Sequence, residues 1–395
     1  MKNYKLHISD GFKDLYGKEI LVKKELENRV LESFKSFGYE LIQTPGLEYV
    51  DVYSLDGHQK PDLYNLINRQ GEVLALSNDM TSSIARFVGS SNTLPNKLKF
   101  CYSNSVYRYP RLYQGKNHEF LQAGVELIGE DGVAQDASII YLAYRTLKCC
   151  NVNSFTINIG SSKFLDVLFD DLKISSELKD EIYDCIENKD YVTLRQVLES
   201  STNSDASSFL IDLMMRGGKL KFIEGLINKL NGYKSQEEVI YLKKLYMYLR
   251  ELDVDNIIFD FSIYPYARYY TGIVFNVYID NVLKQVISGG RCDNLFKEFG
   301  KDLKNIGFGI NLDLLNDYVI NNNLIDIKKE KYLTIQPDEL FVKATINNEG
   351  FRKEGIYVNQ SSFKSLDEAM KYAKENGYDK VIEYTSNGFD IKEVA

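Results

Sequence analysis

The stretch that decides the fold spans residues 108–126, RYPRLYQGKNHEFLQAGVE. It continues a strand-like run, KLKFCYSNSVY, and returns through a polar loop into a second apolar run that ends in LIG. In the returning run Gln122 and Glu126 lie on one face, because strand side chains repeat with a period of two. Arg108 stands where the first run ends. The stretch therefore predicts an antiparallel hairpin with one face able to hold a polar ligand.

Further helix and strand signals surround this hairpin. The run at 18–37 predicts a long amphipathic helix that ends at Gly38, with apolar residues at helical spacing: Leu26, Val30, Phe34 and Phe37. Pro45 interrupts the strand-like run that follows, which suits a sheet edge or an interface. We also predict a hairpin at Gln70-Gly71, a helix in NDMTSSIARFVG and a hairpin at Asp280-Asn281. Many strands with few helices indicate a large antiparallel sheet with helical cover.

The pattern of apolar residues divides the chain into three parts. A core formed by residues 1–160 and 251–320 is interrupted by a helical insertion, 161–250, which has a break at Gly217-Gly218. The last part, 331–395, predicts a small α/β unit. It begins with a strand in KYLTIQ, continues with a helix opened by a capping box at Ser365 and Glu368 and ended at Gly377, and closes with a hairpin at Asn387-Gly388. The predicted fold class is α+β.

Composition and charge exclude several classes of protein. The 395 residues carry 48 Lys and Arg against 56 Asp and Glu, and the net charge of −8 opposes unspecific binding to nucleic acid or to anionic membranes. No apolar run approaches the length of a signal peptide core or a membrane span, so we expect a cytoplasmic protein. The five cysteines have no CxxC spacing, which indicates free thiols. Three scattered histidines and the lack of a glycine-rich phosphate loop lead us to expect no metal and no cofactor.

Five motifs, taken in order, resemble the class II aminoacyl-tRNA synthetases in their histidyl version. The 108–126 hairpin resembles motif 2, and Thr44-Pro45 with Glu48 resembles motif 1. LALSNDMTSSIAR is similar to the segment that reads the amino acid, YYTGIVF to the histidine-specific strand, and GGRCDNL with IGFGINLDLL to the last strands of the core. The resemblance covers roughly residues 5 to 318 without the helical insertion. It implies a class II synthetase-like antiparallel sheet with flanking helices.

The resemblance also implies a pocket for free histidine. Asp79, Thr81 and Gln122 would hold the α-ammonium group, which needs a carboxylate and other oxygen acceptors. Glu126 and Tyr270 would hold the imidazole ring, with Tyr269 assisting. Arg108 would be a vestigial phosphate-binding arginine. The alternative is that the tyrosines are core aromatics and that Gln122 and Glu126 are a polar pair with no ligand.

Several positions depart from the synthetase pattern. Leu314 stands where motif 3 has its arginine, Pro110 replaces the glutamate that follows Arg108 in motif 2, and Lys116 and His118 replace loop arginines. Pro265 replaces the arginine that contacts the substrate carboxylate, unless Arg268 takes its place. Loss of one preorganised donor typically costs roughly 10²–10³ in rate. We therefore expect no catalytic residue and negligible adenylation.

The carboxyl-terminal unit is too small for an anticodon-binding domain and has too few basic residues. With this unit and these departures, the chain resembles the family of ATP phosphoribosyltransferase regulatory subunits. In that family a short-form catalytic subunit does the chemistry of the first step of histidine biosynthesis, and the synthetase-like subunit activates it and helps confer histidine feedback. The resemblance implies this catalytic subunit as the partner, with free histidine as a possible ligand and neither nucleic acid nor membrane. The alternatives are a histidine–tRNA ligase and another synthetase-derived histidine-binding protein.

Motif 1 also bears on oligomeric state. In the class II enzymes its long helix and following strand pack against a twofold partner, and the apolar stripe with the break at Pro45 is compatible with that use. We expect a homodimer of the core within a larger hetero-oligomer. The alternative is a helix that only covers its own sheet.

Overall fold

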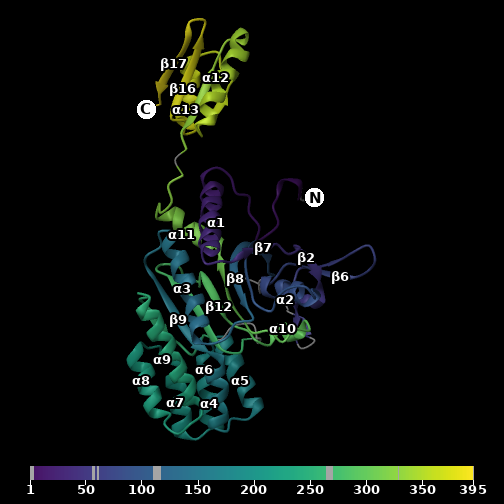
Figure 1. Ribbon diagram of the computed structural model, residues 1–395, viewed down its shortest axis with the longest axis vertical. Coiled ribbons are helices and arrows are strands. Elements are labelled where there is room, and N and C mark those ends of the chain that lie inside the picture. The colour runs from purple at the N-terminus through teal and green to yellow at the C-terminus, as the bar shows by residue number, and fades with distance from the viewer. Residues whose placement is uncertain are drawn as a thin grey trace. The chain divides into compact units, whose positions relative to one another are not determined.

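The computed structural model describes residues 4–55, 58–59, 62–109, 117–263, 270–327 and 329–394. The chain divides into two compact units, Met1–Ile325 and Asp326–Ala395, which Figure 1 shows as ribbons. In the described part of the chain, no helix is both long enough and apolar enough to cross a membrane.

An eight-stranded sheet forms the centre of the first unit. The pairs in its middle are antiparallel, which confirms the predicted antiparallel sheet and the hairpins on either side of the loop after Tyr109 and at Asp280-Asn281. The two outermost pairs are parallel, which the sequence pattern did not predict. The strand order is β1 (Glu40–Leu41), β7 (Leu98–Tyr107), β8 (Glu119–Ile128), β13 (Asn305–Asn311), β12 (Ile287–Arg291), β11 (Ile273–Ile279), β9 (Phe155–Ser161) and β10 (Ile257–Phe259).

One face of this sheet is apolar and is covered by three helices, α1 (Lys18–Ser36), α3 (Val133–Cys149) and α11 (Leu312–Asn321). The predicted first helix is confirmed, and it buries Leu26, Val30 and Phe34, while Phe37 follows its last turn. The Phe34 ring meets Phe308 of β13 edge-on with ring centroids 5.7 Å apart. Burial of these side chains drives the packing, because aromatic and aliphatic groups contribute most of the apolar area removed from water.

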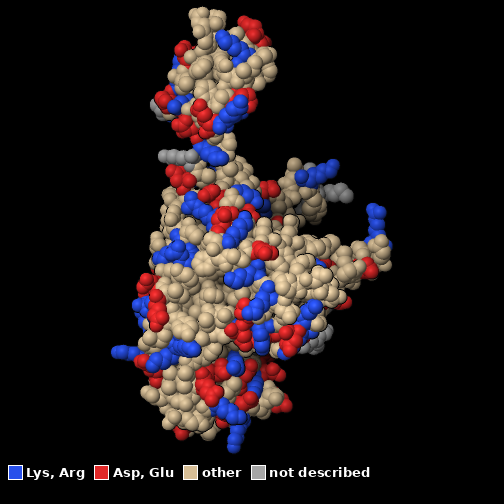
Figure 2. Space-filling model, viewed as in Figure 1, with Lys and Arg blue, Asp and Glu red and all other residues tan. Residues whose placement is uncertain are grey.

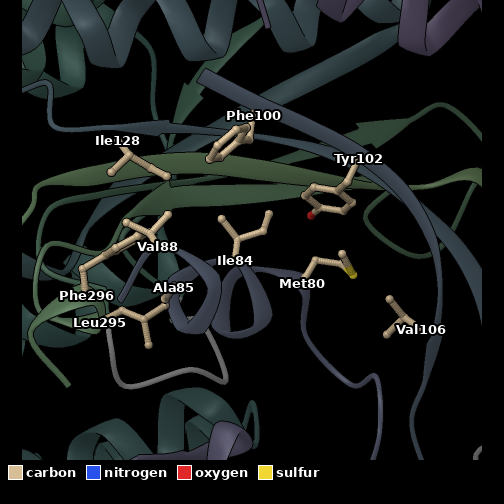
Figure 3. Close-up of a cluster of buried hydrophobic side chains, with 10 residues drawn as sticks. All are labelled: Met80, Ile84, Ala85, Val88, Phe100, Tyr102, Val106, Ile128, Leu295 and Phe296. Atoms are coloured by element: carbon tan, nitrogen blue, oxygen red, sulfur yellow. The ribbon is translucent and has the colours of Figure 1, made fainter. Parts of the chain in front are cut away.

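The opposite face is covered at one end by α2 (Met80–Ser90) and α10 (Leu295–Glu298). Figure 3 shows Met80 and Ile84 of α2 packed beside Phe100 and Tyr102 of β7, with Phe296 of α10 next to Val88 at the other end of the cluster. The helix predicted in NDMTSSIARFVG is confirmed, and Asp79 caps it. The rest of this face carries small and polar residues.

A three-stranded sheet lies beside α2. It consists of β2 (Leu47–Tyr49), β6 (Val73–Leu76) and β5 (Asn65–Ile67), and the antiparallel pairing of β5 with β6 confirms the hairpin at Gln70-Gly71. Gly71 has a φ of +84°, which favours glycine at the turn. The remaining short elements are η1 (Tyr4–Leu6), η2 (Val50–Tyr53) and the pair β3 (Ser54–Leu55) with β4 (His58–Gln59).

Six consecutive helices follow β9, as the periodicity predicts for that part of the chain. Ser161, Ser175, Asp190 and Asn203 each accept a backbone N–H at the start of one of the first four helices. The predicted break at Gly217-Gly218 is confirmed between the fourth and the fifth helix. The helices are α4 (Ser162–Asp171), α5 (Ser176–Glu187), α6 (Tyr191–Ser201), α7 (Ser204–Met215), α8 (Leu220–Lys229) and α9 (Ser235–Glu251).

The second unit is a small α/β unit, as predicted. Its sheet has the order β15 (Tyr357–Gln360), β14 (Lys331–Ile335), β16 (Lys380–Thr385) and β17 (Gly388–Glu393). The predicted strand and hairpin are confirmed, and so is the helix before Gly377, α13 (Leu366–Glu375). The capping box was a wrong interpretation, because the Ser365 side chain makes no capping hydrogen bond. We did not predict β15, α12 (Phe341–Lys353) or the short turn η3 (Asp338–Leu340).

A buried ion cluster ties the sheet to α3 and α9. The Arg291 guanidinium at the end of β12 donates to Asp136 of α3, with Nε 3.0 Å from Oδ1, and to Asp293 at 3.3 Å. The Tyr241 hydroxyl of α9 donates to the other oxygen of Asp136 at 2.8 Å. Arg291 and Asp136 are both buried. The cluster therefore fixes the position of two helices on the sheet.

Arg291→Met should destabilise the protein, because it leaves Asp136 buried without its cation, whereas Asp293 keeps Lys304 at 3.1 Å. Breaking a buried ion pair from one side typically costs about 3–5 kcal/mol. Denaturant unfolding measures the change. Lys97→Met is the matched control, since Lys97 pairs with Glu130 at the surface, and such a pair contributes under about 1 kcal/mol. Equal destabilisation by the two variants would contradict the assignment of the Arg291 cluster as a structural anchor.

Candidate functional site

Glycines open the polar face of the central sheet. A Cβ atom at Gly307 would lie 2.4 Å from Glu126 Oε2, and one at Gly309 would lie 2.5 Å from Gln122 Nε2. A Cβ atom at Gly290 would likewise lie 2.7 Å from the Tyr270 ring. At these glycines, β12 and β13 carry no side chain. The side chains of Glu126, Gln122 and Tyr270 occupy the space above them.

Glu126 is the central group of this face. Its side chain accepts a hydrogen bond from the Thr81 hydroxyl at 2.6 Å and one from the Asn305 amide nitrogen at 2.7 Å, and it is only 2% exposed. Burial raises the pKa of Glu126 to about 7, although the hydrogen bonds from Thr81 and Asn305 oppose the rise and the nearby Asp79 adds to it. The carboxyl group can therefore gain or lose a proton near neutral pH.

The first turn of α2 brings two more predicted residues to Glu126. Asp79 caps the helix by accepting from the Thr81 backbone N–H at 3.0 Å, and the Ser82 hydroxyl donates to its second oxygen at 3.3 Å. This geometry directs the Thr81 hydroxyl at Glu126. Further along the helix, Arg86 donates to the buried Glu48 of β2 at 2.6 Å. The motif 1 strand therefore holds the helix that carries Asp79 and Thr81.

Gln122 and Tyr270 are the other two predicted histidine-site residues that the structure describes. Gln122 shares the strand face of Glu126; Glu126 is opposite Gly307, and the Gln122 amide reaches over Gly309. The Glu126 carboxyl is bonded to Thr81 and Asn305 rather than to Gln122. Tyr270 lies against Gly290, and burial raises the pKa of its hydroxyl, with a further contribution from Glu126. Tyr269 lies outside the described residues.

Arg108 lies at the end of β7 beside this face. Its Nε donates to the Asn78 carbonyl at 3.3 Å, and its guanidinium is 5.3 Å from the centroid of the Phe120 ring. Its positive charge acts on the hydroxyls of Tyr102 and Tyr270 by lowering their pKa, against the larger effect of burial. Arg108 therefore adds a positive charge close to this face of the sheet.

Two of the departures from the synthetase pattern lie on described residues. Leu314 is half-buried in the first turn of α11, where its N–H donates to Asn311 Oδ1 at 3.0 Å. His118 hydrogen-bonds the Tyr64 hydroxyl, and its ring contacts Phe12 and Tyr109. His118 therefore belongs to an aromatic cluster with the amino-terminal segment. Outside the described residues lie Pro110, Lys116, Pro265 and Arg268.

Sequence reasoning missed Asn305 and Cys292. Asn305 is the first residue of β13 and bonds Glu126, and its amide nitrogen is also 3.0 Å from the Cys292 sulfur. The one signal in the sequence is a polar residue at the head of the glycine-rich strand NIGFGIN. All five cysteines are free, as predicted, and only Cys149 is exposed. Within the described residues, no three His, Cys, Asp or Glu side chains come together as metal ligands would.

The antiparallel sheet, its glycine-lined polar face and the capped helix beside it make up the core of a class II aminoacyl-tRNA synthetase. Residues 11–315 match the family model of the histidyl-tRNA synthetase. The ATP phosphoribosyltransferase regulatory subunit of Clostridium kluyveri is 31% identical, and the match covers 94% of this chain and 97% of that protein. The chain therefore belongs to the histidyl-tRNA synthetase-like family of ATP phosphoribosyltransferase regulatory subunits.

Solved structures agree with this assignment. An ATP phosphoribosyltransferase regulatory subunit/histidyl-tRNA synthetase from Bacillus halodurans superposes with a TM-score of 0.84 at 28% identity, covering 97% of this chain and 99% of that one. A histidyl-tRNA synthetase from Nostoc gives a TM-score of 0.84 at 20% identity, covering 98% of this chain and 95% of that one, and shows the fold alone. The predicted class II synthetase-like fold is confirmed.

Glu126→Gln should change how stability depends on pH. The pKa of Glu126 in the folded protein is raised from 4.5 to about 7, so the folded state holds this proton more tightly than the unfolded chain. The wild type should therefore lose stability relative to Glu126→Gln as the pH rises from about 4.5 to 7, with no further relative change above that range. Denaturant unfolding at several pH values measures the difference. A constant difference between the two proteins over this range would contradict the raised pKa.

Proposed function

We propose that the chain is a non-catalytic regulatory subunit that activates a short-form ATP phosphoribosyltransferase catalytic subunit, the first enzyme of histidine biosynthesis. Histidine bound in the pocket around Glu126 provides feedback in this proposal. The observation that supports it is the polar cluster of Thr81 and Glu126 over the β13 glycines, in a chain whose relative over nearly its full length bears the regulatory subunit name. The pocket belongs to the discontinuous core, 1–160 and 251–320, rather than to the helical insertion, 161–250, or the terminal unit, 331–395.

The pocket offers partners for most of a histidine molecule. The α-ammonium group would contact Asp79, Thr81 and Gln122, and the imidazole would contact Glu126 and Tyr270, with Tyr269 beside them. With Pro265 in place of an arginine, the ligand carboxylate loses a charge-assisted hydrogen bond of about 1.5–3 kcal/mol unless Arg268 supplies it. Such a loss weakens binding tenfold or more. We therefore expect modest affinity, which suits a feedback site that must respond to changes in histidine concentration.

The same residues argue against adenylation. The synthetase reaction needs fixed cations around the phosphate, and Leu314 supplies an apolar side chain at one of those positions. Arg108 retains a cation at the other position. Pro110 removes a further polar group. The proposal therefore includes no catalytic residue, no metal and no cofactor.

Surface charge favours a protein partner over a nucleic acid. On the face in Figure 2, the described Lys and Arg side chains alternate with Asp and Glu without a continuous basic surface. The net charge of −8 acts in the same direction. We therefore propose no tRNA partner and no membrane partner for this chain.

We also propose that the core forms a homodimer through the outer face of the β2–β6–β5 sheet. Leu47, Tyr49 and Leu66 lie on that face and are 41%, 55% and 44% exposed, while Glu48 points inward and is buried. Leu74 and Leu76 share the face. Such an apolar sheet face on the motif 1 strand suits a second copy of the chain.

Histidine titration and partner assays test the function together. Wild type should give heat with millimolar histidine, and it should raise the activity of a short-form catalytic subunit, an effect that histidine reverses. Glu126→Gln should weaken histidine binding about tenfold or more, because it removes the charged acceptor of the imidazole. Glu119→Gln is the matched control on the same strand, where the side chain accepts from Tyr107.

Each alternative function has its own outcome in these assays. Histidine-dependent exchange between pyrophosphate and ATP by the isolated chain would identify a ligase. Histidine binding without any effect on the catalytic subunit would identify another histidine-binding protein. Equal histidine affinity in Glu126→Gln and wild type would mean that these residues support the fold and do not bind histidine.

Leu66→Asp should convert the dimer into a monomer, because it places a charge in the middle of the proposed apolar interface. Light scattering at micromolar concentration measures the mass. Ile240→Asp is the control, since Ile240 is also exposed but lies on α9. A wild-type monomer at this concentration would overturn the proposal and favour a first helix that only covers its own sheet.

A further inference from the structure

Glu126 is a buried carboxyl group whose hydrogen-bond partners are neutral. These partners are the Thr81 hydroxyl and the Asn305 amide. Among the described residues, the titratable groups that interact with its charge are Asp79 of α2, Tyr102 of β7 and, elsewhere around the sheet, Tyr39, Tyr270 and Cys292. None of them is a cation. An ionised carboxylate in such surroundings lacks the compensating charge that buried carboxylates usually have.

The Asn305 amide can form a hydrogen bond with Glu126 in either charge state. Its nitrogen donates to Glu126 Oε2 at 2.7 Å and to the Cys292 sulfur at 3.0 Å, while its buried oxygen has no hydrogen-bond partner among the described residues. The two ends of an amide have the same shape, and a half-turn of the side chain exchanges them. After that turn, the oxygen accepts from a protonated Glu126 and from the Cys292 thiol. Each orientation makes two hydrogen bonds and leaves one end unbonded.

We propose that Asn305 is a positioning residue that lets Glu126 hold its ligand in either charge state, so that the carboxyl group and an imidazole ring share one proton. The inference rests on the proposed histidine pocket. In one arrangement Glu126 is a carboxylate beside an imidazolium, and in the other it is a carboxylic acid beside a neutral ring. The proton moves between a carboxylate oxygen and a ring nitrogen, and the total charge of the pair stays the same.

A shared proton makes binding depend on pH in both directions. The pKa of Glu126 is about 7, and that of a free imidazole side chain is about 6.5. Below both pKa values, free Glu126 and the free imidazole each carry a proton, so formation of the complex releases one proton. Above both values, neither carries one, so formation of the complex takes one proton up from solution. Affinity is therefore highest between about pH 6.5 and 7.

The other facing groups do not obscure this dependence. Burial raises the pKa of Tyr39, Tyr102, Tyr270 and Cys292 above their ordinary values, so they keep their protons throughout the neutral range. Asp79 is the other carboxyl group, and its oxygens accept from the first turn of α2.

Calorimetric titration with histidine from pH 5.5 to 8.5, in buffers of different ionisation enthalpy, measures both affinity and proton exchange. The wild type should bind most tightly near pH 6.5–7, with proton release on the acid side and uptake on the alkaline side. Asn305→Leu removes an amide hydrogen bond that lowers the pKa of Glu126, so the pKa of Glu126 should rise in this variant. The optimum, which lies midway between the two pKa values, should move up by half of that rise.

Asn316→Leu is the matched control. Asn316 is also buried, and within the described part of the chain its side-chain oxygen also lacks a hydrogen-bond partner, but it lies in α11. A general loss of packing should affect both variants, whereas only Asn305→Leu should move the optimum. An optimum that moves equally in both variants, or in neither, overturns the role of Asn305.

Unfolding without a ligand separates this inference from the histidine proposal. The stability difference between wild type and Glu126→Gln should become constant near pH 7, and the same difference in an Asn305→Leu background should become constant at a higher pH. If Asn305→Leu does not fold, Asn305→Asp keeps the shape and moves the plateau further, because it adds a second carboxyl group. An unmoved plateau overturns the inference even where histidine binds. A wild type that binds no histidine overturns the proposed function and the shared proton with it.

Discussion

The register between β8 and β13 is the constraint on which the site depends. It places Gly307 opposite Glu126 and Gly309 opposite Gly124, so the middle strand of the sheet has no side chain where the polar groups need room. A shift of one residue would put Phe308 on this face and would expose apolar residues that now pack against α1 and α11. The apolar core on one face therefore fixes the positions of the polar side chains on the other.

The pocket also depends on the ends of two elements. Asp79 ends a loop and caps α2, which turns the Thr81 hydroxyl toward Glu126. Asn305 begins β13, where its backbone N–H donates to Asp293 Oδ1 at 3.2 Å. Asp293 in turn belongs to the Arg291 cluster, which reaches α3 and α9. A contiguous polar network therefore links the pocket to the helices behind the sheet, and any coupling between them would need two stable arrangements of this network.

The spacing of apolar residues and the identity of the turn residues were enough to predict the hairpins, the first helix and α2. Each of these elements depends on a pattern that is local in the sequence. They could not predict the parallel edge pairs, which form between segments far apart in sequence. In α12 the buried face carries Asn348, while Val342 and Ile346 are exposed, so no apolar stripe marks the helix. Asn305 lies 179 positions from Glu126, and only the fold brings them together.

The proposed binding residues and the position where Leu314 departs from the synthetase pattern lie in structurally different places. Asp79, Thr81 and Glu126 are held by a helix cap, a strand register and glycine contacts, and all of these also hold the fold. Leu314, by contrast, is a half-buried residue in the first turn of a helix whose capping comes from Asn311. An arginine at such a position can be replaced without disturbing the strands. Under the proposed function, the chain has therefore lost cations of the synthetase reaction while the residues proposed to recognise an amino acid stay in place, since those residues and the core rest on the same contacts.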